Sequence, residues 1–271
     1  MTEKITILAC QIEVPNFSDV ETKHIHNQRV AGLIDASLTN THCDLVVLPE
    51  LSNMDYSQEA FENLEDLAET DTGPTFEVFS KLAKKHKTTI AYGFAKLGDN
   101  CFYISQMIVG PDGNKLGRYD KIHLAHFGAS YEKNYFHAGK GTITFEVAGF
   151  KIAPIICYDI RFPELTNKLT VDDGAHIILH CGAYAQDPSF YSWHPFAITR
   201  ALENQVYLLS LNRAGENYGQ SLFCEPWVDN ETQPFQFNDG EQLKTFELTK
   251  EQVYKARDKY TFLKDRRPKS Y

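Results

Sequence analysis

The sequence lacks paired cysteines, a membrane-spanning run and a secretion signal. Its six cysteines are scattered through 271 residues without a C-x-x-C pair, and in a chain of this length that pattern predicts reduced thiols and a cytoplasmic location. No apolar run is long enough to cross a bilayer, and the apolar stretch near the first residue is too short for a signal peptide. We therefore expect a soluble cytoplasmic protein with no membrane partner.

Basic residues are too few and too dispersed for a nucleic-acid-binding surface. Lysine and arginine total 27 against 36 acidic residues, which gives a formal net charge of −9, whereas binding to phosphates needs a basic footprint. The densest basic segment, residues 264–269, is interrupted by Asp265 and Pro268. The G-x-S-x-G elbow of serine hydrolases and the glycine-rich loop of nucleotide enzymes are also missing. These absences argue against nucleic acid as a partner, serine hydrolysis and nucleotide chemistry.

No repeat, low-complexity tract or linker divides the chain, so we expect one domain over residues 1–271, with residues 262–271 as a C-terminal tail. Helical and strand patterns alternate first and strands then follow one another, which predicts an α/β fold with mixed sheets and outer helices. The expected helices are 20–38, 56–69, 74–86, 165–170, 190–204 and 250–260. The expected strands are 5–11, 44–50, 88–95, 101–109, 118–124, 142–147, 152–156, 175–180, 205–211, 221–227 and 243–248, with a long loop at 125–141.

One cysteine stands directly after a predicted buried strand. The apolar run Ile152 to Ile156 ends at Cys157, and the polar residues Tyr158, Asp159 and Arg161 follow at once. Because ligand sites of open α/β folds lie at the carboxyl ends of strands, Cys157 is a candidate nucleophile. The alternative is a small buried hydrophobe, which is the usual role of a free cysteine on an apolar strand.

Two further charged groups stand at or near strand ends. Glu50 follows the apolar segment L-V-V-L-P (45–49), and Lys121 lies in Y-D-K-I-H-L (119–124). If both meet Cys157 in one cleft, the carboxylate can accept the thiol proton while the lysine stabilises developing negative charge. Taken singly, Glu50 could be a helix cap and Lys121 an exposed charge on an edge strand.

A metal hydrolase is the competing chemistry. His123, His126 and His137 are close enough in sequence to share a metal, yet the H-x-x-H spacing comes without a matching C-x-x-C or H-E-x-x-H motif. We expect ordinary surface or site-edge histidines at these positions, and no metal.

Three motifs together resemble the nitrilase superfamily, the carbon–nitrogen hydrolases, along nearly the whole chain. They are L-V-V-L-P-E-L (45–51), Y-D-K-I-H-L (119–124) and I-I-C-Y-D-I-R-F-P-E-L (155–165), supported by R-A-L-E-N-Q-V-Y (200–207), L-N-R-A-G (211–215) and D-R-R-P-K-S-Y (265–271). The resemblance implies a single-domain, four-layer αββα sandwich. It also implies a Glu–Lys–Cys triad carried by Glu50, Lys121 and Cys157, and a homodimer or larger homo-oligomer.

Two more positions follow from the resemblance. Glu132, in Y-E-K-N-Y-F-H-A-G (131–139), is similar to the family's second glutamate near the thiol, although a loop salt bridge is the alternative. Many members carry a proline-containing segment that ends in an aromatic residue lining the substrate pocket. Here the segment reads H-C-G-A-Y-A-Q-D (180–187), so Tyr184 is the expected aromatic and the shape of the acyl pocket stays open.

Substrate contacts are expected from three residues. The backbone N–H of Tyr158 should help Lys121 to hold an oxyanion. Arg161 or Arg213 could meet a substrate carboxylate, and either could equally form a structural ion pair.

The resemblance implies a cysteine-dependent hydrolase of a non-peptide carbon–nitrogen bond, without cofactor. The expected substrate is a small carboxylic acid amide of the ω-amidase kind, cleaved through a thioester with release of ammonia. An N-carbamoyl compound is the first alternative substrate and a nitrile the second. A catalytically silent relative that serves as a binding subunit is the non-enzymatic alternative.

Overall fold

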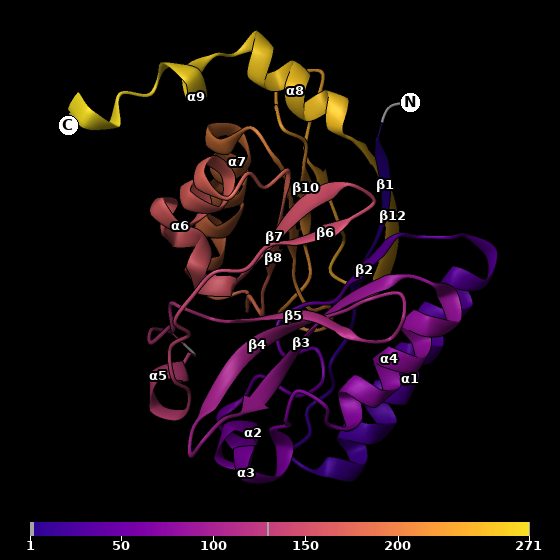
Figure 1. Ribbon diagram of the computed structural model, residues 1–271. Helices are drawn as coiled ribbons and strands as arrows, with labels where there is room; N and C mark the ends of the chain where they lie inside the picture. The colour runs from indigo at the N-terminus through magenta and orange to yellow at the C-terminus, as the bar shows by residue number, and fades with distance from the viewer. Residues whose placement is uncertain (1–2, 129, 271) are drawn as a thin grey trace.

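In the computed structural model, which describes residues 3–128 and 130–270, two β-sheets stack against each other between layers of helix (Figure 1). The first described sheet has the order β12(Gln242–Thr249), β1(Lys4–Gln11), β2(Leu45–Val47), β3(Thr89–Leu97), β4(Phe102–Val109), β5(Lys115–Asp120). The second has the order β11(Phe235–Gln236), β10(Leu222–Cys224), β9(Tyr207–Leu211), β8(Ile177–Cys181), β7(Phe150–Ile156), β6(Phe145–Val147). Each sheet is parallel at its centre, through β1–β2–β3 and β7–β8–β9, and antiparallel at its edges.

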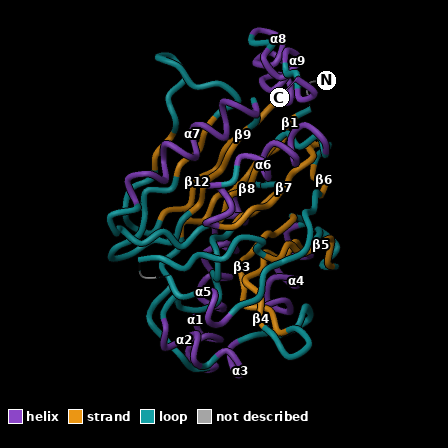
Figure 2. The backbone as a smooth tube through the Cα atoms, turned by 90° about the vertical axis from the view of Figure 1, so that its left-hand side faces the viewer, coloured by secondary structure: helices purple, strands orange, loops and turns teal. Residues whose placement is uncertain are grey.

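Helices cover the outer face of each sheet. The long helices α1(Val20–Asn40) and α4(Pro74–His86) pack on the first sheet, and α6(Pro163–Asn167) and α7(Trp193–Asn204) pack on the second. Figure 2 shows α6 and α7 lying over β7, β8 and β9. The remaining α-helices are α2(Gln58–Glu62), α3(Leu64–Leu67), α5(Glu132–Tyr135), α8(Lys250–Lys259) and α9(Phe262–Asp265). The expected single-domain αββα sandwich is therefore confirmed.

The alternation of side chains along each strand makes two kinds of core. On β1, Ile7 and Ala9 join Ile152 of β7 in the apolar layer between the sheets. Their neighbours Leu8 and Cys10 pack instead with residues of α1 and α4. Successive strand residues point to opposite faces of the sheet. A strand that is apolar on both faces therefore packs against the other sheet on one side and against the helices on the other.

Helix ends follow local signals in the sequence. Asp19 caps α1 by accepting a hydrogen bond from the Thr22 N–H at 2.8 Å, a contact worth about 1 kcal/mol. Pro74 opens α4, where its missing N–H costs nothing. The expected boundaries of that helix, 74–86, agree with those in the structure.

Three expectations near the site were wrong in detail. The helix expected at 56–69 is two short helices, α2 and α3, because the backbone leaves the helical region at Asn63. The loop expected at 125–141 contains α5. The strand expected at 118–124 ends at Asp120, so Lys121 lies just beyond β5. In each case the local pattern was too short or too polar to predict the observed element.

The C-terminal residues continue past α8 into α9 and a short 3₁₀ turn, Pro268–Ser270, and extend beyond the body of the fold (Figure 1). Arg266 of this segment donates a hydrogen bond to Asn167 at 2.8 Å. Of the helices in the described part of the chain, none combines the length and apolar character needed to cross a membrane.

Candidate active site

The first part of the site is the turn that carries Glu50 away from β2. Leu51 has φ +44°, a left-handed backbone that is rare for a residue with a side chain. The turn lies so close to β3 that a Cβ at Gly93 would stand 2.3 Å from the carbonyl oxygen of Pro49. Arg213 fixes the turn by donating to the Leu51 carbonyl at 2.6 Å. Glu50 is therefore held, fully buried, at one position.

The second part is the turn that begins at Cys157. This residue follows β7, starts the 3₁₀ helix Cys157–Arg161 and has φ +46°. Such a backbone costs on the order of 1–3 kcal/mol and persists where the surroundings fix it. Here Asp159 is the fixing group, because its Oδ2 accepts from the Ile156 N–H at 3.0 Å and from the Tyr119 hydroxyl at 2.7 Å.

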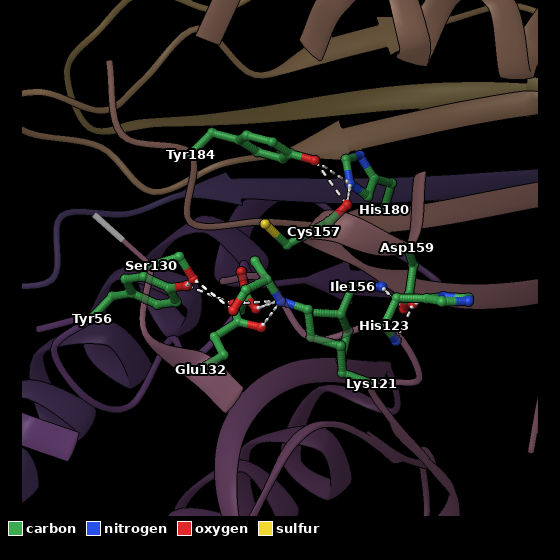
Figure 3. Close-up of polar contacts among 12 residues, drawn as sticks. Tyr56, Lys121, His123, Ser130, Glu132, Ile156, Cys157, Asp159, His180 and Tyr184 are labelled. Carbon is green, nitrogen blue, oxygen red and sulfur yellow. Dashed lines mark hydrogen bonds and ion pairs between the residues drawn. The ribbon is translucent and has the colours of Figure 1, made fainter. Parts of the chain in front are cut away.

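The third part is a buried cluster of one ammonium and two carboxylates (Figure 3). Lys121 Nζ lies 2.8 Å from Glu50 Oε1 and 2.6 Å from Glu132 Oε1. All three side chains have no exposed surface. Glu132 is fixed further by the Tyr56 hydroxyl, which donates to Oε1 at 2.5 Å, and by the Ala125 N–H, which donates to Oε2 at 2.8 Å.

The electrostatics of this cluster determine its protonation. Burial raises the pKa of Glu50, with Lys121 opposing and Glu132 adding to the effect. Burial alone would lower the pKa of Lys121, but the two carboxylates raise it well above its usual value. Burial and Glu50 raise the pKa of Cys157 well above its usual value, against Lys121 and a backbone hydrogen bond from Ala183. These shifts favour a charged Lys121 and a protonated Cys157 thiol.

The cluster also contains one carboxylate oxygen that is unpaired among the described residues. Glu50 Oε2 is buried and has no hydrogen-bond partner among the described residues. A buried acceptor without a partner is costly, so this oxygen is a candidate functional atom of the site.

Cys157 is 9% exposed and opens onto a small pocket of about 80 Å³. Two charged side chains, Arg161 and Asp187, line it together with aromatic and small residues. The other lining residues are Tyr56, Ala125, Phe127, Ser130, Tyr158, Ala183, Tyr184, Ala185, Ser189 and Tyr218.

The aromatic residues predicted at the pocket have different roles. The half-buried Tyr158 lines the pocket directly after the thiol. The ring of Tyr184 lines it too and stacks on Trp193 at a centroid distance of 4.6 Å. The Tyr184 hydroxyl donates to the carbonyl oxygen of Cys157 at 2.8 Å. It therefore binds the protein backbone and is not directed at a substrate.

The two candidate arginines are also distinguished. The half-buried Arg161 bonds to Ser192 Oγ at 3.2 Å and stands over the Phe196 ring at 5.1 Å. No carboxylate lies within 4.0 Å of it in residues 3–128 and 130–270. Arg213 is 1% exposed; its Nε and Nη2 donate to backbone carbonyls, including that of Met54 at 2.7 Å, and its Nη1 lies 3.8 Å from Asp55 Oδ1. Arg161 is thus the cation available to a ligand.

The three histidines considered as metal ligands either contact other side chains or face solvent. His123 Nδ1 lies 2.7 Å from Asp159 Oδ1, and its ring stacks on Phe162 at 3.7 Å. His126 is exposed, as is His137. Over the part of the chain that the structure describes, no group of three or more His, Cys, Asp or Glu side chains could hold a metal ion.

Several residues of the site were not predicted from the sequence. Tyr56 binds Glu132, Asp159 holds the nucleophile turn, and His180 contacts the Cys157 carbonyl. Only Asp159 carried a signal, because a buried acid two residues after the thiol needs donors nearby. Tyr56 and His180 come from segments whose folding toward Cys157 could not be read from local sequence.

The supporting motifs hold the site in place. Arg200 of α7 donates to the carbonyl of Ile160, inside the turn that begins at Cys157, at 2.9 Å. Asn212 accepts from the Tyr184 N–H at 2.7 Å and donates back to the Tyr184 carbonyl at 3.0 Å. Arg200 and Asn212, from two of the supporting motifs, therefore anchor the turn that begins at Cys157 and the segment at Tyr184.

Comparison with known proteins identifies relatives. Residues 9–257 match the family model described as carbon-nitrogen hydrolase. The chain is 34% identical over 192 residues to the 2-oxoglutaramate amidase of Bacillus subtilis, covering 69% of this chain and 71% of that one. It is 26% identical over 283 residues to omega-amidase NIT3 of Saccharomyces cerevisiae, covering 98% of this chain and 94% of that one.

Solved structures agree. The crystal structure of Saccharomyces cerevisiae Nit3, described as a member of branch 10 of the nitrilase superfamily, aligns with a TM-score of 0.82 at 26% identity, covering 95% of this chain and 94% of that one. The match to the family model extends over most of the chain and includes both turns and the buried cluster. The chain is therefore a carbon–nitrogen hydrolase and belongs to the nitrilase superfamily.

Proposed function

We propose that this enzyme hydrolyses the terminal amide of a small dicarboxylic acid monoamide, with Cys157 as nucleophile and without a cofactor. The observation that carries the proposal is the buried Glu50–Lys121–Glu132 cluster beside a thiol whose pocket also contains Arg161. The cluster supplies a base and a fixed positive charge, and Arg161 supplies a partner for a carboxylate. The names of the two amidase relatives point to the same class of substrate.

Acylation starts from the neutral thiol. Glu50 takes the Cys157 proton as the sulfur attacks the amide carbon, and the carbonyl π electrons move onto oxygen. Lys121 and the Tyr158 N–H hold this oxyanion. When the tetrahedral intermediate collapses, the carbon–nitrogen bond breaks and protonated Glu50 gives its proton to the leaving nitrogen. Ammonia departs and a thioester remains on Cys157.

Deacylation repeats the same proton transfers with water. Glu50 takes a proton from water as the oxygen attacks the thioester carbon, and the same donors hold the oxyanion. The carbon–sulfur bond then breaks, the thiolate recovers the proton from Glu50, and the acid leaves. Glu132 keeps Lys121 charged and in position through both halves of the reaction.

Arg161 gives the proposal its sharpest test, through substrates that differ only in the distal carboxylate. We expect the wild-type enzyme to release ammonia from the monoamide of a four- or five-carbon dicarboxylic acid much faster than from an uncharged amide of equal length. Arg161→Met should raise KM for the acid substrate roughly 10- to 100-fold, the value of one charge-assisted contact, and should leave the uncharged amide unaffected. Steady-state ammonia assays on both substrates measure this difference.

The assay also separates the rival substrates. If Arg161→Met lost activity equally on the charged and the uncharged amide, Arg161 would have no role in recognising the substrate carboxylate. Faster release of ammonia together with carbon dioxide from N-carbamoyl acids would favour that alternative. A wild-type protein that releases no ammonia across the panel would favour the catalytically silent relative.

The raised pKa of Glu50 predicts the acidic limb of the pH profile. Glu50 must be ionised to accept the thiol proton, and its pKa is raised above the ordinary 4.5 by burial. We expect kcat/KM to fall as pH decreases through a value above 4.5, while Lys121 stays charged to above pH 10.5. Circular dichroism at each pH separates this titration from unfolding. A limb centred at or below 4.5 would contradict Glu50 as the base.

Assembly and location are further parts of the proposal. On the family resemblance we propose a homodimer or larger homo-oligomer that acts in the cytoplasm.

A further inference from the structure

The carbonyl oxygen of Cys157 accepts two side-chain hydrogen bonds in the fully buried interior behind the nucleophile. The Tyr184 hydroxyl donates to it at 2.8 Å, and His180 Nε2 lies 2.9 Å from it. Figure 3 shows this carbonyl directed at Tyr184 and His180, away from Lys121 and Glu132. His180 has no exposed surface, and Tyr184 is 8% exposed. Two protein donors on one buried carbonyl form a specific arrangement, here called the carbonyl clamp.

The direction of each hydrogen bond in the clamp follows from its acceptor, because the carbonyl oxygen of Cys157 can only accept. Burial lowers the pKa of His180 to about 4, so its ring is neutral near pH 7 and carries one N–H. Trp193 Nε1 can only donate, and it donates to Ser210 Oγ at 2.7 Å. Ser210 Oγ lies 2.7 Å from His180 Nδ1 and can donate its hydrogen to that nitrogen. The ring hydrogen of His180 is then on Nε2, where it binds the Cys157 carbonyl.

The clamp acts on the oxyanion donor through the geometry of one peptide bond. The C=O of Cys157 and the N–H of Tyr158 belong to the same planar trans peptide unit, so they point in opposite directions. Two donors that fix the carbonyl on one side therefore fix the N–H on the other. Tyr158 is the second residue of the 3₁₀ helix, where an N–H has no intrahelical acceptor and can serve a ligand.

Hydrogen bonding to the carbonyl also strengthens that N–H. An amide whose oxygen accepts hydrogen bonds is polarised, and the polarisation makes its N–H a better donor. The effect is largest for an acceptor that carries developing negative charge, which here is the oxyanion and not the ground-state amide.

We propose that His180 and Tyr184 are positioning residues that orient and polarise the Tyr158 N–H as an oxyanion donor; the inference rests on the proposed function. Ser210 and Trp193 support it by keeping the His180 hydrogen on Nε2. The clamp comes from the segment in which this chain departs from the family pattern, H-C-G-A-Y (180–184).

The test compares two reactions of the same sulfur. Hydrolysis of the ω-amide passes through an oxyanion, whereas alkylation of Cys157 by iodoacetamide does not. Tyr184→Phe keeps the ring that stacks on Trp193 and deletes one donor of the clamp. We expect kcat for hydrolysis to fall about tenfold, the value of one hydrogen bond, while the alkylation rate constant stays within about twofold of wild type.

His180 provides a rescue test and Tyr207 a matched control. His180→Gln can still place an amide N–H near the carbonyl and should retain more hydrolysis than His180→Phe, with alkylation again unchanged. Tyr207→Phe deletes a buried tyrosine hydroxyl that bonds to the Thr249 carbonyl at 3.1 Å, away from the pocket. It should leave both reactions unchanged.

The outcomes separate this inference from the proposed function. Hydrolysis of the ω-amide by the wild-type enzyme tests the proposed function. The ratio of the hydrolysis rate to the alkylation rate in Tyr184→Phe tests the role of the clamp. An equal fall in hydrolysis and alkylation would mean that the clamp positions the thiol and not the Tyr158 N–H. Unchanged hydrolysis would mean that the clamp positions neither group. Each of these two results overturns the proposal. Weaker binding of an aldehyde analogue of the acyl group, whose adduct also carries an oxygen at the oxyanion position, gives the same readout without turnover.

Discussion

Cys157→Ala should abolish amide hydrolysis and leave the protein folded. Removing the nucleophile of a hydrolase costs on the order of a million-fold in kcat, because the remaining groups have no bond-forming partner. Alanine keeps the backbone at φ +46° as strained as cysteine does, so the free energy of unfolding should change by only about 1 kcal/mol. Ammonia release and urea unfolding measure the two effects.

A second cysteine controls for general loss of a thiol. Cys224 is fully buried on β10, outside the pocket, and Cys224→Ala should keep hydrolysis near the wild-type rate. In the wild-type enzyme, mass spectrometry of a trapped acyl intermediate should find the adduct on Cys157. Full activity in Cys157→Ala, or an adduct on Cys181 or Cys224, would remove Cys157 from the mechanism.

Lys121→Met should damage activity and stability together. Loss of an oxyanion donor costs on the order of 100- to 1,000-fold in kcat. The same change leaves Glu50 and Glu132 facing each other in a buried site without their cation, and breaking a buried ion pair typically costs about 3–5 kcal/mol of unfolding free energy. Urea unfolding and ammonia release at neutral pH measure both losses.

The pH dependence of this stability loss identifies its cause. Without Lys121 the two carboxylates should have pKa values raised above the ordinary range, because burial and their mutual repulsion favour the neutral forms. The destabilisation should therefore be complete at neutral pH and should decrease as pH falls through those raised pKa values. Lys121→Met combined with Glu132→Gln should recover stability without recovering activity. Lys168→Met, which breaks the exposed pair with Asp173, is the control and should cost under about 1 kcal/mol.

The layers of the fold could be predicted from the sequence because burial leaves a periodic pattern. Helix α4 had both a start signal at Pro74 and a clear apolar stripe, and its boundaries were predicted correctly. Helix α5 had neither: it spans Glu132–Tyr135, and its buried residue is the charged Glu132. Apolar periodicity cannot predict an element whose buried face is an ion pair.

The site was predicted unevenly for a similar reason. Glu50, Lys121 and Cys157 stand in motifs that are specific in combination, so family resemblance pointed to them. Tyr184 was expected as a pocket aromatic, but its hydroxyl binds the backbone of Cys157. That contact depends on how two strands of the second sheet lie side by side, which no local stretch of sequence encodes. Whether these residues perform the proposed chemistry stays a prediction until the variants are measured.

The proposed reacting groups come from different sheets, and this has a consequence for evolution and engineering. Glu50 and Lys121 follow strands of the first sheet, whereas Cys157 follows β7 of the second. The layer that joins the sheets contains small residues such as Ala9 and Ala91. A bulkier side chain in this layer would move the two sheets apart and would increase the distance from the Glu50 carboxylate to the Cys157 sulfur, without altering any residue of the pocket. Turnover would then respond to substitutions remote from the pocket, so a screen confined to pocket residues would miss part of what tunes this enzyme.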